Sequence, residues 1–323
     1  MTKEVSEKEF NKKVKTQKFK GVKNEAVKCK PKKTPKAPKH LFKLHTVAVF
    51  VGNIGSGKTN AVSLEIQAYN NYGSFNRTFI ISPTYEYNDP LKLLGADKKD
   101  IYTDRLNALS AIADIKHKIL EMKYEYEEAV EYKIAYKAWK KGMDTPKQFA
   151  ILQRANQTTD TTGFKKPPKH IPWPSPCLVI DDMSHSDIYG AQRSNDFVNL
   201  VLTCRHIHGI GCSLFLLLQS FKTGAQKVVR QNARQFHIFP THDYSQLKSM
   251  YEDLASVVSY EDFISLYKCA IDGNKHNFLT IDMTADDEKK KTFRRNFDEF
   301  IWIEGMGVDG KAEIESKEVN INV

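Results

Sequence analysis

The amino-acid sequence predicts an α/β fold built around a central, mainly parallel sheet. Short apolar runs alternate with amphipathic stretches of helical period along most of the chain. A glycine-rich segment, 52–59, separates the first apolar run from the first helical stretch. Strands that alternate with helices are typical of a parallel sheet covered by helices on both faces. A chain of 323 residues is long enough for one large domain or two modest ones.

The glycine-rich segment reads G-x-x-x-x-G-K-T from Gly52 to Thr59. It follows the apolar run 45–51 and precedes the helix-like stretch 60–69, which is the strand–loop–helix context of a phosphate-binding P-loop. Its glycines let backbone N–H groups face phosphate oxygens, and the following helix adds the positive end of its dipole. We expect Lys58 to reach the β- and γ-phosphates and the Thr59 hydroxyl to hold Mg²⁺; a chance match is the alternative. The predicted nucleotide-binding residues are Gly52, Asn53, Ile54, Gly55, Ser56, Gly57, Lys58, Thr59 and Asn60.

The next elements are a buried strand at 77–82 and a short strand at 101–103. Residues 104–141 contain neither Gly nor Pro and carry apolar side chains at helical spacing, so we expect one long helix or two shorter ones. We interpret 143–176 as an irregular, Pro-rich connector. The whole segment 104–176 has the character of an insertion into the core. A peripheral layer is the simplest role for it, and a subunit or capsid contact is the alternative.

The second half of the chain continues the alternation of apolar and amphipathic segments. The expected elements are strands at 177–180, 213–218 and 236–239, helices at 195–205, 224–233 and 244–271, and a terminal strand pair at 278–282 and 300–303.

Two acidic residues follow the apolar strand that begins at Cys177. An apolar strand that ends in an acid is the Walker B pattern, and we expect it to bring Asp181 beside Thr59 to complete the Mg²⁺ shell. Asp182 comes next and is expected to orient or deprotonate the attacking water. The alternative is a strand that ends in two surface acids.

Two further residues are expected in the catalytic site. Gln219 ends the apolar strand 213–218, and the carboxyl end of a core strand in an open α/β sheet faces the ligand crevice. We expect its amide to sense the γ-phosphate; a turn residue is the alternative. Arg205 is expected to reach the γ-phosphate of an adjacent subunit, and a surface salt-bridge arginine is the alternative. Its rivals for that role are Arg193, Arg230 and Arg234.

Two segments of the second half resemble a known superfamily. Residues 205–220 resemble the Arg…Gly-Ile…strand…Gln pattern of the FtsK–HerA translocases, and 230–239 resemble their following Asn-containing segment and strand. The Asp181-Asp182 pair and the Arg205-His206 pair are most similar to the poxvirus-type genome-packaging ATPases of giant viruses and virophages. The resemblance covers about residues 45–283. Asp182, where many hydrolysing motors use Glu, and the long helical insertion depart from the wider pattern.

The resemblance implies a P-loop NTPase core that uses ATP and Mg²⁺ to translocate double-stranded DNA into a preformed capsid. It implies a homo-oligomeric ring, a hexamer or a pentamer, with a capsid protein as a further partner. The implied location is the host-cell cytoplasm or a viral factory, with association to the virion. A HerA-like helicase or conjugative DNA pump is the alternative within the superfamily. Outside the superfamily, the alternatives are a non-motor nucleotide-binding switch or kinase and a capsid-associated protein with a vestigial nucleotide site. The sequence has no N-K-x-D motif of a GTPase, and every catalytic position is filled.

The positive charge is uneven. Residues 1–44 hold 15 Lys and 4 Glu, a net charge of +11, whereas the whole chain has +10, so the remainder carries −1. We expect a disordered basic arm at 1–40, an ATPase core at 41–283 and a terminal strand and tail at 284–323. The arm suits contact with phosphate backbones or anionic protein, or nuclear import; a solvated tail is the alternative.

The remaining composition excludes several classes of protein. Five cysteines without C-x-x-C spacing argue against a disulfide framework or a zinc site and fit a reducing compartment. No apolar run reaches the length of a membrane span, and no apolar signal region opens the chain. We therefore expect neither a membrane anchor nor secretion.

Overall fold

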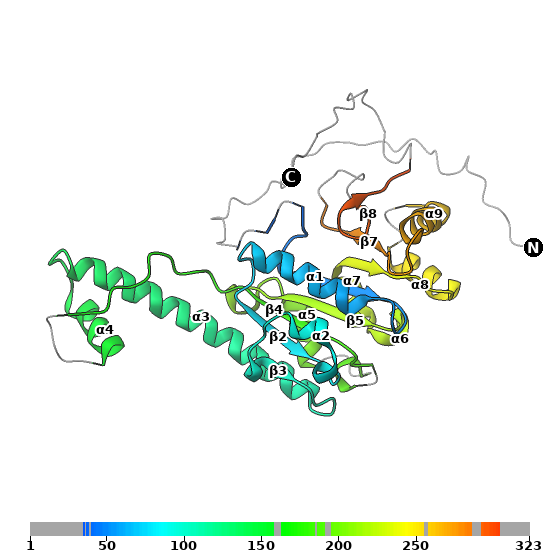
Figure 1. Cartoon of the computed structure of the whole chain (residues 1–323). Helices are drawn as coiled ribbons and strands as arrows, with labels where there is room; N and C mark the ends of the chain where they lie inside the picture. Colours follow the sequence, from blue (N-terminus) through cyan, green and yellow to red (C-terminus); the bar gives the residue numbers. More distant parts are fainter. Residues whose placement is uncertain are drawn as a thin grey trace, which may run out of the picture. The chain divides into compact units, whose positions relative to one another are not determined.

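The structure is a computed structural model, shown in Figure 1. It describes residues 35, 37–38, 40–157, 163–184, 186–190, 195–254, 258–285 and 292–303. Most of the predicted basic arm, most of the predicted tail and Arg193 lie outside these ranges.

A nine-stranded sheet forms the centre of the described chain, in the order β3-β2-β4-β5-β1-β6-β7-β8-β9. The strands from β3 to β6 in this order are parallel, and β7, β8 and β9 are added antiparallel at one edge. The predicted α/β class with a mainly parallel sheet is therefore confirmed. The strands are β1 Val47–Val51, β2 Arg77–Ile81, β3 Ile101–Tyr102, β4 Pro176–Ile180, β5 Ser213–Leu218, β6 Ala233–Ile238, β7 Leu279–Asp282, β8 Phe293–Arg295 and β9 Glu299–Phe300.

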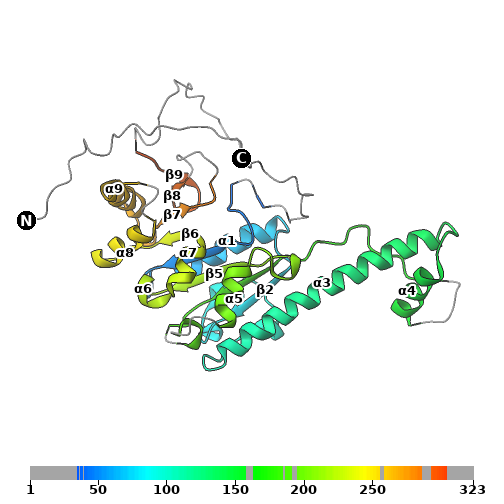
Figure 2. The ribbon, with the colours of Figure 1, turned by 180° about the vertical axis from the view of Figure 1, so that it is seen from behind.

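Helices cover both faces of this sheet (Figures 1 and 2). Because successive side chains of a strand point to opposite faces, β1 supplies Val49 to one core cluster and Phe50 to the other. Helices α1 and α2 pack in the cluster with Phe50, and α3, α5, α7, α8 and α9 pack in the cluster with Val49. Burial on both faces explains why the central strands read as continuous apolar runs. The helices are α1 Lys58–Asn71, α2 Asp89–Lys92, α3 Ala108–Trp139, α4 Pro146–Asn156, α5 Asp196–Thr203, α6 Phe221–Gly224, α7 Lys227–Asn232, α8 Tyr244–Leu254 and α9 Tyr260–Ile271, with short 3-10 turns at Tyr85–Tyr87, Lys98–Asp100, Asp187–Tyr189 and Ile207–Gly209.

The long helix α3 is one continuous helix of 32 residues, and its two halves pack differently. Side chains of the first half, such as Ile112 and Ile119, belong to the core of the sheet. Ala135 of the second half packs instead with Leu152 of α4 and with Phe164 in a small separate core. We call residues 132–169 the α3–α4 module. Its helices lie away from the sheet in Figures 1 and 2.

The predicted connector 143–176 was wrong in part, because it contains the helix α4. Thr145 and Gln148 form a reciprocal capping box at its start, and Pro146 occupies the first helical position. This cap provides the signal for a helix, and burial of Leu152 against α3 stabilises it.

Three other predicted elements needed correction. The chain is extended at Ala225, so of the predicted helix 224–233 only α7 is formed, and α6 is a separate helical turn before it. The predicted helix 244–271 is two helices, and the Ser259 hydroxyl caps the second one by accepting a hydrogen bond from the Asp262 N–H. The predicted terminal pair is separated by β8, which pairs with β7 on one side and β9 on the other, and its second strand is Glu299–Phe300 rather than 300–303.

Candidate functional site

The predicted nucleotide-binding and Walker B segments meet at one edge of the sheet, where the parallel strands end. The loop 52–59 follows β1, Asp181 follows β4 and Gln219 follows β5. The Gly52 N–H donates to the carbonyl of Leu218, which ties the start of the loop to the end of β5. Because parallel strands have their carboxyl ends at the same edge, the topology brings these distant segments together.

The loop has the backbone geometry that requires glycine. A Cβ on Gly52 would lie 2.6 Å from Cβ of Phe239, so no larger residue fits there. Gly57 has a φ of 102° and forms the N-cap of α1, and the first turn of α1 carries no acidic residue. The amino end of α1 is therefore positive and open to an anion.

Lys58 folds over this loop. Its ammonium Nζ donates to the carbonyl of Gly52 at 2.7 Å and to that of Asn53 at 2.9 Å. Burial lowers the pKa of Lys58, and the nearby carboxylates of Asp181 and Asp182 oppose this effect. A phosphate at the loop would add negative charge beside the same ammonium, and would favour its charged form.

Thr59 and Asp181 are in direct contact. The Thr59 hydroxyl donates to Oδ2 of Asp181 at 3.2 Å, and the Asn88 amide donates to the same oxygen at 3.3 Å. Burial raises the pKa of Asp181 to about 6, against the effects of the Thr59 hydrogen bond and the Lys58 charge. A buried carboxylate beside a hydroxyl is a hard-oxygen pair that suits Mg²⁺, and bound cation would keep the carboxylate ionised.

Asp182 lies beside this pair with a φ of 52°, in the left-handed region that Asp tolerates better than most residues. The Gln219 amide donates to its Oδ1 at 3.3 Å. Nη2 of Arg105 donates to its backbone carbonyl at 2.8 Å and lies 3.6 Å from Oδ2. The carboxylate is thus held from two sides while its side chain stays about one-third exposed, at 32%.

Sequence reasoning missed Asn88 and Arg105, because neither belongs to a motif. Both are recognisable by position, since Asn88 lies beyond the end of β2 and Arg105 beyond the end of β3. The carboxyl ends of β2 and β3 lie at the same edge as the P-loop. His276 was also missed; its Nδ1 lies 3.1 Å from the carbonyl oxygen of Ser56 in the loop.

Arg205 lies at the opposite edge of the sheet. The carbonyl of its neighbour Cys204 accepts from the N–H of Cys212, which immediately precedes β5, and the Cys204 thiol contacts the carbonyl of His45, before β1. The length of β1, roughly 16 Å, therefore separates Arg205 from the loop of its own chain. Arg205 is exposed and forms no ion pair with the residues that the structure describes.

Of the rival arginines, Arg230 is paired with Asp253, with Nε 2.7 Å from the carboxylate, and lies over the ring of Phe221. Arg234 is exposed at the start of β6 and therefore shares the exposed position of Arg205 at the amino edge of the sheet. Arg193 lies outside the described residues.

The described residues fit a bound Mg²⁺–nucleotide. A cavity of about 220 Å³ lies between the loop and the Walker B residues, and its lining includes Lys58, Thr59, Asp181, Asp182 and Gln219. The Ser56 hydroxyl in the loop is buried and has no hydrogen-bond partner within the described chain. Within that same part of the chain, no three His, Cys, Asp or Glu side chains group as a metal site. Mg²⁺ commonly needs only one or two carboxylates, because substrate phosphates and water complete its shell.

No helix among the described residues is long and apolar enough to span a membrane.

No protein-family model matches the chain, and no curated protein matches it. Solved structures that are similar to it include the genome packaging NTPase B204 from Sulfolobus turreted icosahedral virus 2, with 13% identity, 78% of this chain and 96% of that chain covered, and a TM-score of 0.43. The pCW3 conjugation coupling protein TcpA is 14% identical over 75% of this chain and 58% of its own, with a TM-score of 0.38. EssC from Geobacillus thermodenitrificans is 14% identical over 78% of this chain and 39% of its own, with a TM-score of 0.38.

Identities this low concern the fold alone. What the chain does has to follow from its own side chains at the sheet edge.

Proposed function

We propose that the chain is an Mg²⁺-dependent ATPase that translocates double-stranded DNA, and that it packages a viral genome into a preformed capsid. The observation that carries the ATPase assignment is the contact of Thr59 with Asp181 beside Lys58, at the ends of two separate parallel strands. These residues are far apart in the sequence, and the fold brings together a cation, a hydroxyl and a carboxylate around one cavity. That arrangement serves a metal-bound triphosphate.

The residues of the loop would bind and orient the nucleotide. Lys58 would exchange its two carbonyl contacts for phosphate oxygens, and the N–H groups at the start of α1 would face the same anion. Thr59 and Asp181 would hold Mg²⁺, which when bound neutralises charge on the β- and γ-phosphate oxygens. At neutral pH the Asp181 carboxyl is largely ionised, because its pKa of about 6 lies below that pH.

Asp182 would orient the attacking water and accept its proton. Its carboxylate is partly exposed and therefore accessible to water, and Gln219 and Arg105 fix its position. General-base assistance of this kind contributes about 10²–10⁴ in rate. Gln219 links this carboxylate to the end of β5, so a change at the γ-phosphate would be passed to the segment that follows it.

Arg205 would act on the nucleotide of a neighbouring subunit. It cannot serve its own loop, because it lies at the amino edge of the sheet and the loop lies at the carboxyl edge. An exposed, unpaired guanidinium at that edge can enter the site of the next copy in a ring. A homo-oligomeric ring is therefore part of the proposal.

The assignment to DNA and to packaging is supported by the resemblance of residues 205–220 and 230–239 to the packaging branch of the FtsK–HerA translocases. The proposed partners are double-stranded DNA and a capsid protein, and the proposed place is the viral factory or the host cytoplasm.

The experiment is an ATPase assay with and without linear duplex DNA, together with displacement of a third strand from a duplex that carries a triplex. We expect severalfold stimulation by duplex DNA and ATP-dependent loss of the third strand, while the duplex itself stays paired. Indifference to DNA would instead favour a non-motor switch. Separation of the duplex strands would favour a helicase.

A further inference from the structure

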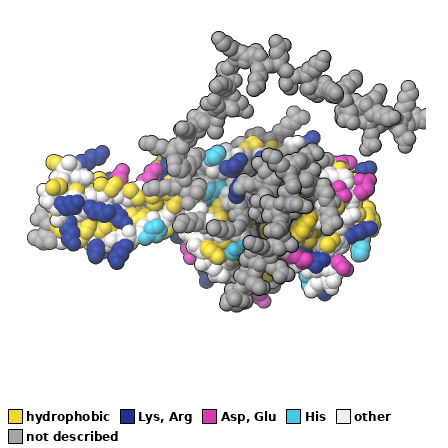
Figure 3. All heavy atoms as spheres, turned by 90° about the horizontal axis from the view of Figure 1, so that it is seen from above, with side chains coloured by type: hydrophobic (Ala, Val, Ile, Leu, Met, Phe, Trp, Pro, Cys, Tyr) yellow, Lys and Arg dark blue, Asp and Glu magenta, His cyan; other side chains and the backbone are white. Residues whose placement is uncertain are grey.

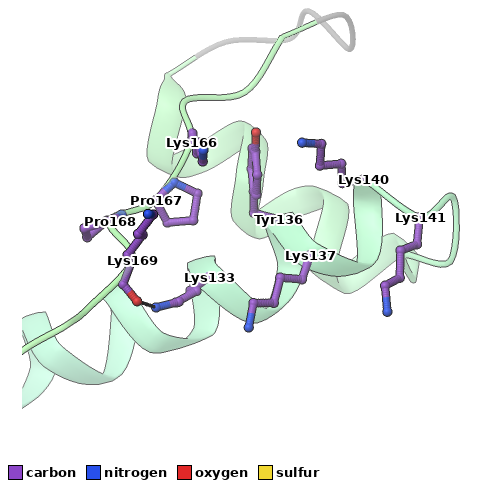
Figure 4. A pocket seen from close by; sticks show the side chains of 9 residues that line it. All are labelled: Lys133, Tyr136, Lys137, Lys140, Lys141, Lys166, Pro167, Pro168 and Lys169. Atoms are coloured by element: carbon purple, nitrogen blue, oxygen red, sulfur yellow. Dashed lines mark hydrogen bonds between the residues drawn. The ribbon is translucent and has the colours of Figure 1, made fainter.

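The α3–α4 module carries a groove with an unusual composition. Six lysines line it, from the end of α3 and from the connector after α4: Lys133, Lys137, Lys140, Lys141, Lys166 and Lys169. The other lining residues are Tyr136 and two prolines, and the volume is about 690 Å³. We call it the lysine groove (Figure 4). Lys and Arg side chains gather over this module at the left of Figure 3.

The net charge of the whole chain does not reveal how positive the α3–α4 module is. Residues 132–169 contain nine Lys and Arg and two Asp, a net charge of +7. The body from residue 45 onward has a net charge of −1, so the rest of it is acidic. The module is thus a second strongly basic segment besides the N-terminal arm.

The lysines of the groove have no acidic partners in the described chain, in contrast to those in the first half of the same helix. There, Lys116 pairs with Asp196 at 2.6 Å, Lys118 with Asp114 at 3.0 Å and Lys123 with Glu127 at 3.8 Å. Among the groove lysines, only the ammonium of Lys133 donates a hydrogen bond to the described residues, to the backbone carbonyl of Lys169. A helix face that only needs solvation usually interleaves acids with its lysines, and this one does not.

A small core holds the groove in shape. Phe164, just before the connector lysines, packs edge-on against Trp139 of α3, with ring centroids 5.1 Å apart. The Tyr132 hydroxyl donates to the carbonyl of Lys165 and receives a hydrogen bond from the Asn156 amide at 2.9 Å. These contacts fix the connector beside α3, so the like charges are held together and repel one another. A bound polyanion would relieve that repulsion.

We propose that the lysine groove binds the phosphodiester backbone of double-stranded DNA. Lys133 and Lys137 follow each other at four-residue spacing on one face of α3, over about 6 Å of helix, and Lys140 and Lys141 continue this row directly after the last residue of the helix. One strand of B-DNA carries a phosphate about every 3.4 Å along its axis, so this row spans several successive phosphates. Ammonium groups on flexible stems contact phosphates without reading bases, as a motor that moves along any sequence requires.

We choose double-stranded DNA rather than an acidic protein surface as the ligand of the groove. This choice rests on the proposed function, because a DNA translocase binds duplex DNA. The groove would add a contact away from the nucleotide site and keep the duplex near the subunit during turnover. The role assigns no chemistry to these lysines, and ATP hydrolysis without DNA does not depend on them.

The experiment uses the full chain with Lys137, Lys140 and Lys141 all changed to Ala. A charge-matched control carries Lys98→Ala, Lys99→Ala and Lys147→Ala, all of them exposed lysines outside the groove. Binding of a labelled duplex is measured over a series of salt concentrations. The slope of log affinity against log salt should fall by roughly two to three in the groove variant and stay near the wild-type value in the control, because each lost phosphate contact removes about 0.9.

A second measurement locates the contact. Lysine acetylation followed by mass spectrometry should show Lys137, Lys140 and Lys141 protected by duplex DNA, while Lys98 and Lys147 stay reactive. Unchanged ATP hydrolysis without DNA shows that the groove variant is folded.

An unchanged salt slope in the groove variant, with no protection of its lysines in the wild type, would overturn the groove assignment. If DNA still stimulated hydrolysis in that case, the proposed function would stand. Equal affinity for poly-glutamate and for DNA, lost equally in the groove variant, would assign the surface to an acidic protein and overturn the proposal. Failure of wild-type chain to bind duplex DNA at all would overturn both.

Discussion

The carboxyl edge of the sheet and the lysine groove differ in whether their charged side chains have partners. At the sheet edge each functional charge has a partner: Lys58 has two carbonyls, Asp181 has Thr59, and Asp182 has Arg105. In the groove, six lysines stand together without a carboxylate among the lining residues. One region lies on strands buried on both faces, and the other lies on a small core of its own.

The difference indicates two kinds of task. Paired charges on rigid strands have defined positions, which chemistry at a phosphorus atom requires. Unpaired charges on flexible stems have no single position, and they suit a ligand that slides and has the same charge all along its length. Substitutions at the sheet edge should therefore change turnover, and substitutions in the groove should change affinity and its salt dependence.

The largest expected effect comes from Arg205. This residue is exposed and unpaired like the groove lysines, but we assign it to catalysis. Arg205→Ala should reduce turnover about 10³-fold, with nucleotide affinity nearly unchanged, since the arginine contacts charge that develops in the transition state. The measurement is steady-state hydrolysis beside titration with a non-hydrolysable ATP analogue. Arg234→Ala, at another exposed arginine, should keep near wild-type turnover.

Mixing subunits tests whether Arg205 acts across an interface. An Arg205→Ala chain retains Asp182, and an Asp182→Asn chain retains Arg205, so a mixed ring contains some complete sites. Activity should partly return on mixing. No recovery at any ratio would place the arginine's action within one subunit and contradict the geometry described above.

Lys58→Ala should lower hydrolysis about 10²–10³-fold, because it removes a positioned charge from the γ-phosphate. Secondary structure measured by circular dichroism should persist, since the side chain faces the cavity rather than the apolar core. Lys98→Ala, at an exposed lysine of a 3-10 turn, is the matched control and should behave as wild type. Full activity of the Lys58 variant would show that the loop is not the hydrolytic site.

Asp182→Asn should lower turnover about 10²-fold while ATP still binds, because the amide keeps the shape and loses the basic oxygen. Asp187→Asn, an exposed carboxylate five residues away in the sequence, should leave turnover unchanged. Equal losses in both variants would mean that the effect is structural rather than catalytic.

The smallest expected effect is a change in the free energy of unfolding, and it comes from a buried carboxyl group that has no partner. Glu65 on α1 is 1% exposed, and neither of its carboxyl oxygens has a hydrogen-bond partner in the described residues. Burial raises the pKa of Glu65 to about 8, and burial lowers the pKa of His237, whose Nε2 lies 3.7 Å away, to about 3. Both groups are therefore neutral at pH 7 and form no ion pair with each other.

The sign of the pH dependence follows from the raised pKa. The folded chain holds the Glu65 proton more tightly than the unfolded chain, so stability falls as pH rises from about 4.5 to about 8. Glu65→Gln has no titrating carboxyl group, and relative to wild type it should gain on the order of 3 kcal/mol between pH 5 and pH 8. Urea unfolding of both chains at the two pH values checks this. An equal difference in unfolding free energy between the two chains at pH 5 and at pH 8 would contradict the raised pKa of Glu65.

The sequence alone was sufficient for the buried strands and the main motifs. β1, β4 and β5 read as unbroken apolar runs because both of their faces are covered, and the spacing from Gly52 to Thr59 specified the loop. The contact of Thr59 with Asp181 was predicted from the motifs, and the structure brings these residues to 3.2 Å.

Other features could not be predicted because they depend on tertiary neighbours. β8 carries two arginines, and Arg294 is buried only because its guanidinium lies 4.5 Å from the ring centroid of Phe42 and pairs with Asp282. Asn88 and Arg105 acquire their partners only once the sheet order is known. The lysine groove was missed for a different reason: its charge was averaged with an acidic remainder, although a count over 132–169 shows it.

The central claim is that Thr59 and Asp181 hold Mg²⁺ for a triphosphate bound over Lys58. Calorimetric titration with a non-hydrolysable ATP analogue, in Mg²⁺ and in EDTA, tests it most directly. We predict that the affinity for the analogue at pH 7 is about tenfold or more higher in Mg²⁺ than in EDTA, a difference of about 1.4 kcal/mol or more in binding free energy. Asp181→Asn should abolish this difference. The Mg²⁺ effect should also shrink as the pH falls below about 6, where Asp181 takes up a proton. Equal affinity with and without Mg²⁺ in the wild type, or no binding in either, would contradict the account.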